Sequence, residues 1–237
     1  MKSLRSLARV LRHTPLHPQW LLGPKLPPGG LGDLSGRVLD VGSGDGWIWP
    51  HLPKHIDYVS LDYPATGKAL YGARPAVFAD AAALPFQADA FEAVICLEVL
   101  EHVKDPGLVL SEVARVLKPG GCAWFSTPFL YPIHDAPHDF TRFTEHGWRF
   151  QAKAHGLDVT AVRKSNHAIA AAAVLWCLAI SSAPLNRVGP RAWLAAALAI
   201  LTVPSINIFA WVLCHVVPDW KAMASGYAVQ LRKPQRC

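Results

Sequence analysis

A short apolar strand that runs directly into a glycine-rich loop is the feature that most constrains this fold. Val38 to Val41 leads into Gly42-Ser43-Gly44-Asp45-Gly46, with glycines at alternate positions. Glycine lets the chain turn sharply and lets the backbone approach a ligand closely. A dinucleotide-binding loop has the spacing GxGxxG, but Trp47 stands where the third glycine would be. The loop therefore predicts a small-molecule site and argues against a nicotinamide-dependent dehydrogenase.

Predicted strands alternate with predicted helices after this loop. Asp105 is a suitable N-cap and Pro106 a suitable first residue for one helix, and a second helix is predicted over 143–155. This alternation predicts βαβ units and a mainly parallel sheet. The predicted strands cover 37–41, 58–61, 76–79, 91–97, 122–126, 157–162 and 227–231.

Five elements in order carry a resemblance to the class I S-adenosylmethionine-dependent methyltransferase family. They are the loop VLDVGSGDG at 38–46, Asp62 closing the second strand, Asp80 in FADAAALPF, FEAVICLEVLEHV at 91–103, and LKPGG at 117–121. The resemblance covers 37–163 and resumes at 226–233. It implies an α/β fold: a three-layer α/β/α Rossmann-like sheet of seven strands, the last antiparallel, with a hydrophobic helical insertion between strands six and seven.

The resemblance also implies which residues bind the cofactor, S-adenosyl-L-methionine, and its product S-adenosyl-L-homocysteine. The methionine end is expected at the first loop, and Asp62 is expected to accept both ribose hydroxyls. Leu97 is expected to flank the adenine ring or the sulfonium, with an ordinary core leucine as the alternative. The full set is Asp40, Gly42, Gly44, Gly46, Asp62, Asp80, Ala81 and Leu97.

A loop rich in ionisable residues follows the fifth predicted strand, at the edge of the sheet where such folds place ligands. It holds two histidines, two aspartates and an arginine within nine residues, and similar runs occur in a bacterial subset of these methyltransferases. A hydroxyl acceptor needs a general base. We expect His134 or His138 to be that base, Asp139 to orient it, and Arg142 to pair with Asp139 or with an anionic substrate.

Two other interpretations of this loop stay open. The pair formed by Asp139 and Arg142 could cap the next helix, or the His and Asp side chains could ligate a divalent ion. We assign no metal, because no other feature of the chain supports one. Nucleic acid is not expected as a partner, because no aromatic–basic pattern is present. The five cysteines form no CxxC pair, which argues against a zinc ribbon and indicates a reducing compartment.

Two uncharged stretches, 168–185 and 192–218, separate the last two predicted strands. Both approach or exceed the ~18–20 apolar residues that span a bilayer. Arg187 and Arg191 lie between them, and arginines on an outward turn oppose the positive-inside bias. A hairpin that enters the membrane without crossing it is favoured over a two-span anchor and over a soluble lid or dimer interface. Three prolines are expected to interrupt these helices: Pro184, Pro190 and Pro204.

Positive charge is concentrated at the two ends of the chain. Residues 1–36 hold five Lys or Arg and one acid, and residues 221–237 hold four and none. Lys2, Arg5, Arg9 and Arg12 recur at helical spacing beside leucines, which predicts a short basic amphipathic helix. Such a helix is either a solvated cap or a contact with an anionic membrane surface.

These patterns divide the chain into three parts: a basic helix and linker at 1–36, a methyltransferase domain at 37–163 plus 226–233, and a hydrophobic insertion at 164–225. The predicted function is methyl transfer to a small-molecule or lipid-linked acceptor, directed to oxygen, in the cytoplasm at the inner face of a membrane. One alternative is the same catalyst acting on a soluble compound. Another is a non-catalytic, membrane-bound assembly factor that keeps the fold.

Overall fold

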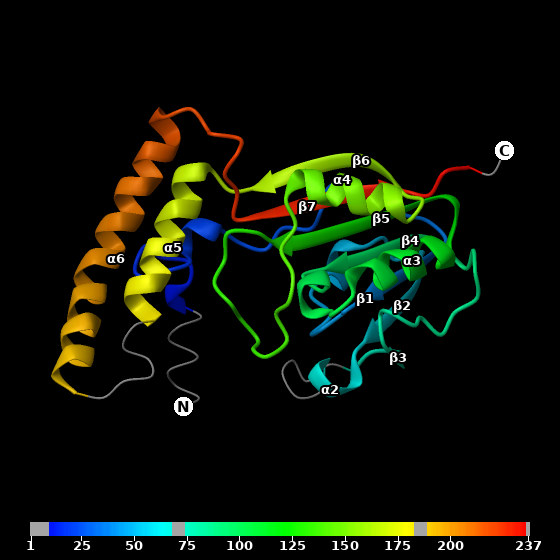
Figure 1. Ribbon diagram of the computed structural model, residues 1–237, viewed down its shortest axis with the longest axis horizontal. Helices are drawn as coiled ribbons and strands as arrows, with labels where there is room; N and C mark the ends of the chain where they lie inside the picture. The colour runs from blue at the N-terminus through cyan, green and yellow to red at the C-terminus, as the bar shows by residue number, and fades with distance from the viewer. Residues whose placement is uncertain (1–9, 68–73, 183–188, 236–237) are drawn as a thin grey trace. The chain divides into compact units, whose positions relative to one another are not determined.

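Seven strands form one sheet in the computed structural model, which describes residues 10–67, 74–182 and 189–235 (Figure 1). The strand order is β3-β2-β1-β4-β5-β7-β6, and β7 runs antiparallel to β5. The predicted fold class is confirmed. The strands are β1 (Arg37–Val41), β2 (Asp57–Asp62), β3 (Val77–Phe78), β4 (Phe91–Leu97), β5 (Leu117–Pro128), β6 (Asp158–Ser165) and β7 (Gly226–Arg232).

The start of β5 differs from the expected turn at Lys118 to Gly121. The strand begins at Leu117, which pairs with Phe91, and its register on β4 shifts before Cys122 pairs with Ala93. Backbone hydrogen bonds with the carboxyl-terminal segment hold the irregular stretch, because Gly120 N donates to Lys233 O at 2.9 Å. Long-range pairing therefore extends the strand through residues that by themselves favour a turn.

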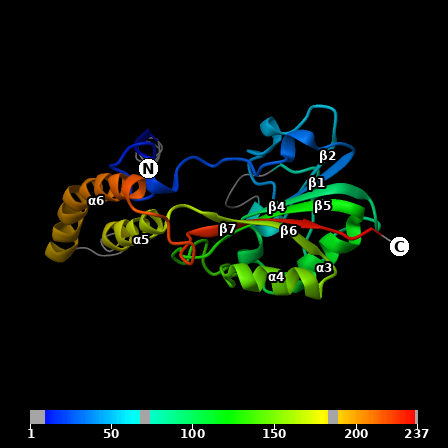
Figure 2. The same cartoon turned by 90° about the horizontal axis from the view of Figure 1, so that it is seen from above.

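Two helices, α3 (Pro106–Val116) and α4 (Glu145–Ala154), cover one face of the sheet (Figure 2). The Asp105 side chain caps α3 by accepting from the amides of Gly107 and Leu108, as predicted. Thr144 caps α4 by accepting from the Gly147 amide. The indole of Trp148 on α4 is completely buried and packs against Phe125 of β5. A short helix, α2 (Pro64–Thr66), follows β2.

The other face of the sheet is covered by two 3-10 turns, η2 (Leu31–Asp33) and η3 (Trp49–His51), with the residues beside them. Leu31 and Leu34 are buried against Val38 of β1, and Trp124 Nε1 donates to Gly29 O at 3.1 Å. The predicted linker over 23–36 is therefore only partly a linker. Burial of these two leucines makes the chain from Pro27 onward part of the sheet's core.

The chain divides into two compact units, which are described here one at a time. The sheet unit comprises Pro27–Phe129, Ile133–Arg163 and Gly226–Cys237, and the helical unit comprises Met1–Leu26, Leu130–Pro132 and Lys164–Ser225. The predicted basic helix falls mainly on residues 1–9, and Pro184 and Arg187 fall within 183–188. These positions lie outside the described residues.

The helical unit is built on α5 (Ala168–Ser182) and α6 (Pro190–Val216), which lie side by side in both views (Figures 1 and 2). Asn207 of α6 is completely buried, and its side-chain amide donates to Pro15 O at 2.7 Å and to His17 O at 3.0 Å. This amide ties the segment before η1 (Trp20–Leu22) to the helix pair.

The helix α6 continues through Pro204, so the predicted interruption at that residue is wrong. A proline removes one helical hydrogen bond, and the packing of α6 along α5 outweighs that loss. Pro190 instead begins the helix, where its missing N–H is of no consequence. Among the described residues, α6 is the helix that is long and apolar enough to cross a membrane, with a mean hydropathy of 2.0.

Replacing Asn207 with leucine is expected to loosen the amino-terminal segment from α6. Two backbone carbonyls lose their donor, which costs about 1–3 kcal/mol each when the groups stay buried. A lower melting temperature and faster proteolysis within residues 10–22 would be measured. Ser205→Ala on the same helix is the control, since that hydroxyl donates to Leu201 O within its own helix. Equal melting temperatures for Asn207→Leu and the parent would contradict the assignment.

Candidate functional site

The loop after β1 packs directly against the loop after β4. The amide of Gly42 donates to Leu61 O at 2.8 Å, and its φ of +72° lies in the left-handed region. A Cβ on Gly42 would lie 2.3 Å from Val99 Cγ2, closer than real atoms approach. Because β1 and β4 are neighbours from which the chain proceeds in opposite directions, this is the crevice where such sheets bind ligands.

Asp62, at the carboxyl end of β2, clamps the glycine loop. Its Oδ2 accepts from the Gly44 amide and its Oδ1 accepts from the Tyr63 amide, both at 2.7 Å. The residue is nearly completely buried. The carboxylate expected to bind ribose hydroxyls therefore also fixes the loop expected to bind the methionine end.

Asp40 is a buried acid directly beneath the same loop. Its residue is 3% exposed, and Tyr58 donates its hydroxyl to Asp40 Oδ2 at 2.5 Å. Burial raises the pKa of Asp40 to about 6, assisted by the negative charge of Asp62 and opposed by the Tyr58 hydrogen bond. Two neighbouring carboxylates in a poorly solvated place favour a cationic ligand, because the ligand's charge relieves their repulsion.

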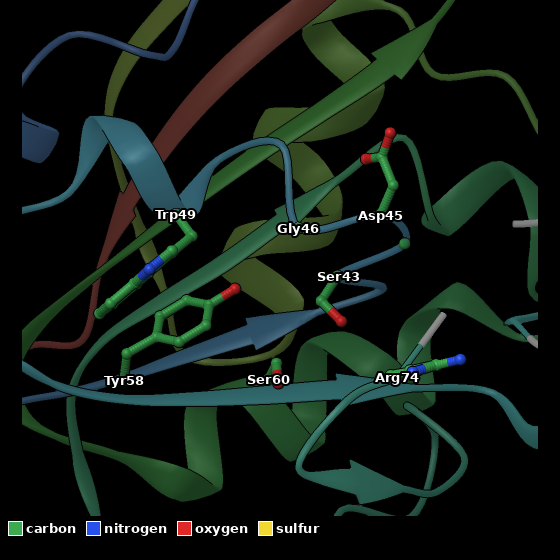
Figure 3. A pocket seen from close by; sticks show the side chains of 8 residues that line it. Ser43, Asp45, Gly46, Trp49, Tyr58, Ser60 and Arg74 are labelled. Carbon is green, nitrogen blue, oxygen red and sulfur yellow. The ribbon is translucent and has the colours of Figure 1, made fainter. Parts of the chain in front are cut away.

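A cavity of about 530 Å³ adjoins the loop (Figure 3). The rings of Trp49 and Tyr58 lie 4.6 Å apart on one side of it, and the Tyr58 hydroxyl is directed toward the loop. Backbone amides, an aromatic pair and adjacent carboxylates fit a nucleoside that carries an amino-acid end. The lining residues are Ser43, Gly44, Asp45, Gly46, Trp49, Tyr58, Ser60 and Arg74.

The remaining predicted cofactor residues lie at the ends of β3 and β4. Ala79 N donates to Asp62 O at 3.1 Å, which brings the chain before Asp80 to the end of β2. The Asp80 side chain is exposed and accepts from the Ala82 amide, while Ala81 is buried. Leu97 is half-buried and packs against the core on the η2 and η3 face.

The loop after β5 brings three of its predicted residues together. His134 Nδ1 lies 3.2 Å from Asp139 Oδ2, and the His134 amide donates to the same oxygen at 3.0 Å. Arg142 donates to both carboxylate oxygens of Asp139, which lowers the pKa of that buried acid to about 2. His138 is placed differently: its imidazole lies against the Phe140 ring.

Glu101, in the 3-10 turn η5 (Leu100–His102), is a residue to which the sequence analysis gave no role. Its side chain is completely buried, and neither carboxylate oxygen has a hydrogen-bond partner among the described residues. Its Oε1 lies 3.7 Å from His102 Nε2 and 3.9 Å from His134 Nε2. Burial, together with the charge of Glu98, raises the pKa of Glu101 to about 8. The sequence signal that could have identified this buried acid was its position within the mostly apolar run 94–103.

The fold is Rossmann-like, and the loop and cavity would accommodate a nucleoside-type ligand at the β1/β4 crevice. Comparison with known proteins indicates which class of enzyme this fold resembles. Residues 39–125 match the family model described as "Methyltransferase domain". A SAM-dependent methyltransferase from Methanosarcina mazei shares the fold, with a TM-score of 0.54 and 15% identity over 90% of this chain and 100% of that one.

Two curated relatives are each similar to part of this chain. The ubiquinone biosynthesis O-methyltransferase of Hahella chejuensis is 35% identical over 118 residues, which cover 43% of this chain and 50% of that protein. The demethylmenaquinone methyltransferase of Renibacterium salmoninarum is 38% identical over 106 residues, 41% of this chain and 44% of that protein. The chain thus spans about half the length of these relatives. Residues 39–125 thus match a methyltransferase domain of the class I, Rossmann-like kind, a family whose cofactor is S-adenosylmethionine.

Asp40→Asn is expected to stabilise the ligand-free protein above pH 6. Because the folded-state pKa of Asp40 is raised from 3.8 to about 6, its ionisation opposes folding. The parent should lose up to about 3 kcal/mol as the pH rises from about 4 to 6, and the amide variant should not. Denaturant unfolding at pH 4 and pH 8 measures this. A variant less stable than the parent at pH 8 would contradict the raised pKa.

Proposed function

We propose that this protein transfers a methyl group from S-adenosylmethionine to a hydroxyl oxygen of a small-molecule or lipid-linked acceptor. The observation that carries the proposal is the pair of buried acids, Asp40 and Asp62, beneath a left-handed glycine loop at the β1/β4 crevice. Their charges suit the ammonium and sulfonium of this cofactor. A pyrophosphate would meet repulsion from the same two carboxylates.

The chain's own residues bind and orient the cofactor. Backbone groups of Gly42 to Gly46 would hold its methionine end, and Asp62 would exchange its bond to the Gly44 amide for bonds to ribose hydroxyls. Bound S-adenosylmethionine supplies a methyl carbon that bonds to the acceptor oxygen as its bond to sulfur breaks, leaving S-adenosylhomocysteine and a hydroxyl proton to remove. Alignment of the two reactants is the chief contribution of such a site.

The acceptor's hydroxyl must lose its proton, and the group His134, Asp139 and Arg142 is suited to that step. Asp139 is held by Arg142, and its Oδ2 lies 3.2 Å from His134 Nδ1, which favours the proton on Nδ1 and the lone pair on Nε2. That lone pair either takes the proton or binds a cation that acidifies the hydroxyl. His138 stays a candidate for the same step.

The names of the two relatives support an acceptor of quinone type. One is named for ubiquinone biosynthesis and O-methylation, the other for demethylmenaquinone. The region that the family model matches, residues 39–125, corresponds to the cofactor half of the sheet. The identity of the acceptor is therefore a proposal. An oxygen acceptor agrees with the ionisable loop after β5.

Calorimetric titration with S-adenosylmethionine tests the cofactor assignment. Binding competed by S-adenosylhomocysteine, and no binding of NAD, is the expected result. Asp62→Ala should weaken binding by about tenfold or more, because a charge-assisted hydrogen bond contributes about 1.5–3 kcal/mol. Asp57→Ala on the same strand is the control, since that exposed acid pairs with Arg37 away from the loop. Absence of heat and of competition would instead support the non-catalytic assembly factor.

We further propose that the helical unit enters the inner face of a membrane without crossing it. The strands β6 and β7 belong to one sheet, so the segment between them must start and finish on the same side of a bilayer. The described helix α5 has 15 residues and is about 22 Å long, shorter than the hydrocarbon core of about 30 Å. A return crossing through α5 is therefore disfavoured.

Large apolar side chains on α6 support this membrane proposal. Trp193 is 78% exposed, Ile200 73% and Leu201 71%, and no Lys, Arg, Asp or Glu occurs between Ala192 and Pro218. Contiguous exposed apolar surface on this scale marks a binding surface for protein or lipid. Basic chain ends favour anionic lipid.

Flotation with vesicles containing anionic lipid tests the membrane contact. The protein is expected to float with the vesicles, and the double substitution Ile200→Lys with Leu201→Lys should release it into the soluble fraction. Leu108→Lys is the matched control, because Leu108 is an apolar residue on α3 that is also half exposed. A parent chain that stays soluble in the presence of vesicles would contradict the proposal.

A further inference from the structure

Three potential ligand atoms converge at the carboxyl edge of the sheet. A carboxylate oxygen of Glu101, a ring nitrogen of His102 and a ring nitrogen of His134 all lie within 4.8 Å of one another. Glu101 and His102 follow β4, whereas His134 comes from the loop after β5. The topology of the sheet, not the local sequence, brings these side chains together.

The Glu101 carboxyl needs a partner that the described chain does not supply. Its two oxygens are the only buried side-chain polar atoms without a hydrogen bond among the described residues. Leaving such a group unsatisfied is destabilising, and more so if it is charged. A protonated Glu101 would have no imidazole acceptor within hydrogen-bond distance as the side chains stand, because the nearest ring nitrogens lie 3.7 and 3.9 Å away. The side chain of Arg142 donates to Asp139 and to Thr141 O, so its positive charge acts on Glu101 without a hydrogen bond to it.

Both imidazoles are held in the tautomer that a metal requires. His102 Nδ1 lies 2.5 Å from the carbonyl oxygen of His138, which can only accept, so this nitrogen carries the proton. His134 Nδ1 faces the Asp139 carboxylate at 3.2 Å in the same way. Each ring therefore has its lone pair on Nε2, the atom that lies nearest Glu101. A histidine that donates to a carboxylate from its other nitrogen is the usual arrangement behind a metal ion.

We propose that Glu101, His102 and His134 bind one divalent transition-metal cation. Two imidazoles and one carboxylate suit Zn²⁺, Mn²⁺, Fe²⁺ or Co²⁺ better than Mg²⁺ or Ca²⁺, which prefer oxygen ligands. The Glu101 oxygen lies 3.7 and 3.9 Å from the two ring nitrogens, and all three ligand atoms lie within 4.8 Å of one another, against a spacing of about 3.4 Å between ligands of a tetrahedral ion. A small inward movement of the side chains would complete the site.

The role of the ion rests on the proposed function, whereas its binding does not. Three protein ligands leave at least one coordination position open, as in catalytic metal sites. An acceptor hydroxyl bound there would lose its proton more readily, because the cation lowers its pKa. With the His134 lone pair on the ion, the metal and not the imidazole would activate the acceptor.

Titration of the untagged full-length protein with Co²⁺, after removal of metal by a chelator, tests the site. We expect one ion per chain with visible ligand-field absorption. His134→Ala and Glu101→Gln should each weaken binding at least tenfold. Asp139→Asn, a positioning change, should weaken it by about 10-fold to 100-fold. His155→Ala should leave the affinity unchanged, because that imidazole bonds to Ser111 on α3 and is not part of the cluster.

Three results would overturn the proposal: no saturable binding, binding that His134→Ala and His102→Ala both leave intact, or an equal loss in His155→Ala. Melting temperatures establish that each variant folds. If Glu101→Gln does not fold, His102→Ala replaces it in the titration. Titration with S-adenosylmethionine is performed in parallel. Metal binding without cofactor binding would refute the proposed function and leave the metal site standing. Cofactor binding without metal binding would refute the metal site and leave the proposed function standing.

Discussion

The close contact between the loop after β1 and the loop after β4 is the constraint on which the rest of the site depends. Gly42 has no Cβ, so its backbone reaches Val99 and still bonds to the end of β2. That approach positions the Gly44 amide for Asp62 and encloses Asp40. The same crevice positions the start of the loop after β4, and that loop carries Glu101 and His102.

Charge is distributed unevenly around this crevice. On the cofactor side, Asp40 and Asp62 lie near each other, no basic side chain among the described residues bonds to either, and burial raises the pKa of Asp40. On the acceptor side, Arg142 bonds to Asp139, whereas the Glu101 oxygens have no hydrogen-bond partner among the described residues. Both sides therefore hold a carboxyl group whose ionisation a bound cation would favour. A sulfonium cofactor suits the first and a metal cation suits the second.

Local sequence predicted much of this arrangement because its signals are short-range. The glycine spacing at 42–46, the Asp105 cap and the alternation of apolar strands each depend on neighbouring residues, and the structure has them nearly as expected. Long-range packing decided the exceptions. Leu31 and Leu34 joined the core, β5 extended through Gly120, and α6 continued through Pro204.

The candidate site was predictable only in part for the same reason. Sequence spacing placed Asp139 and Arg142 three residues apart, within reach of each other, and the structure pairs them with His134. No spacing could reveal that His134 faces Glu101, which is 33 positions earlier in the chain. The sequence alone determined the sheet, the glycine loop and the two uncharged stretches, because those follow from backbone preference and hydrophobicity. Only the tertiary structure decided which acid became buried without a partner, because burial depends on elements that meet across the sheet.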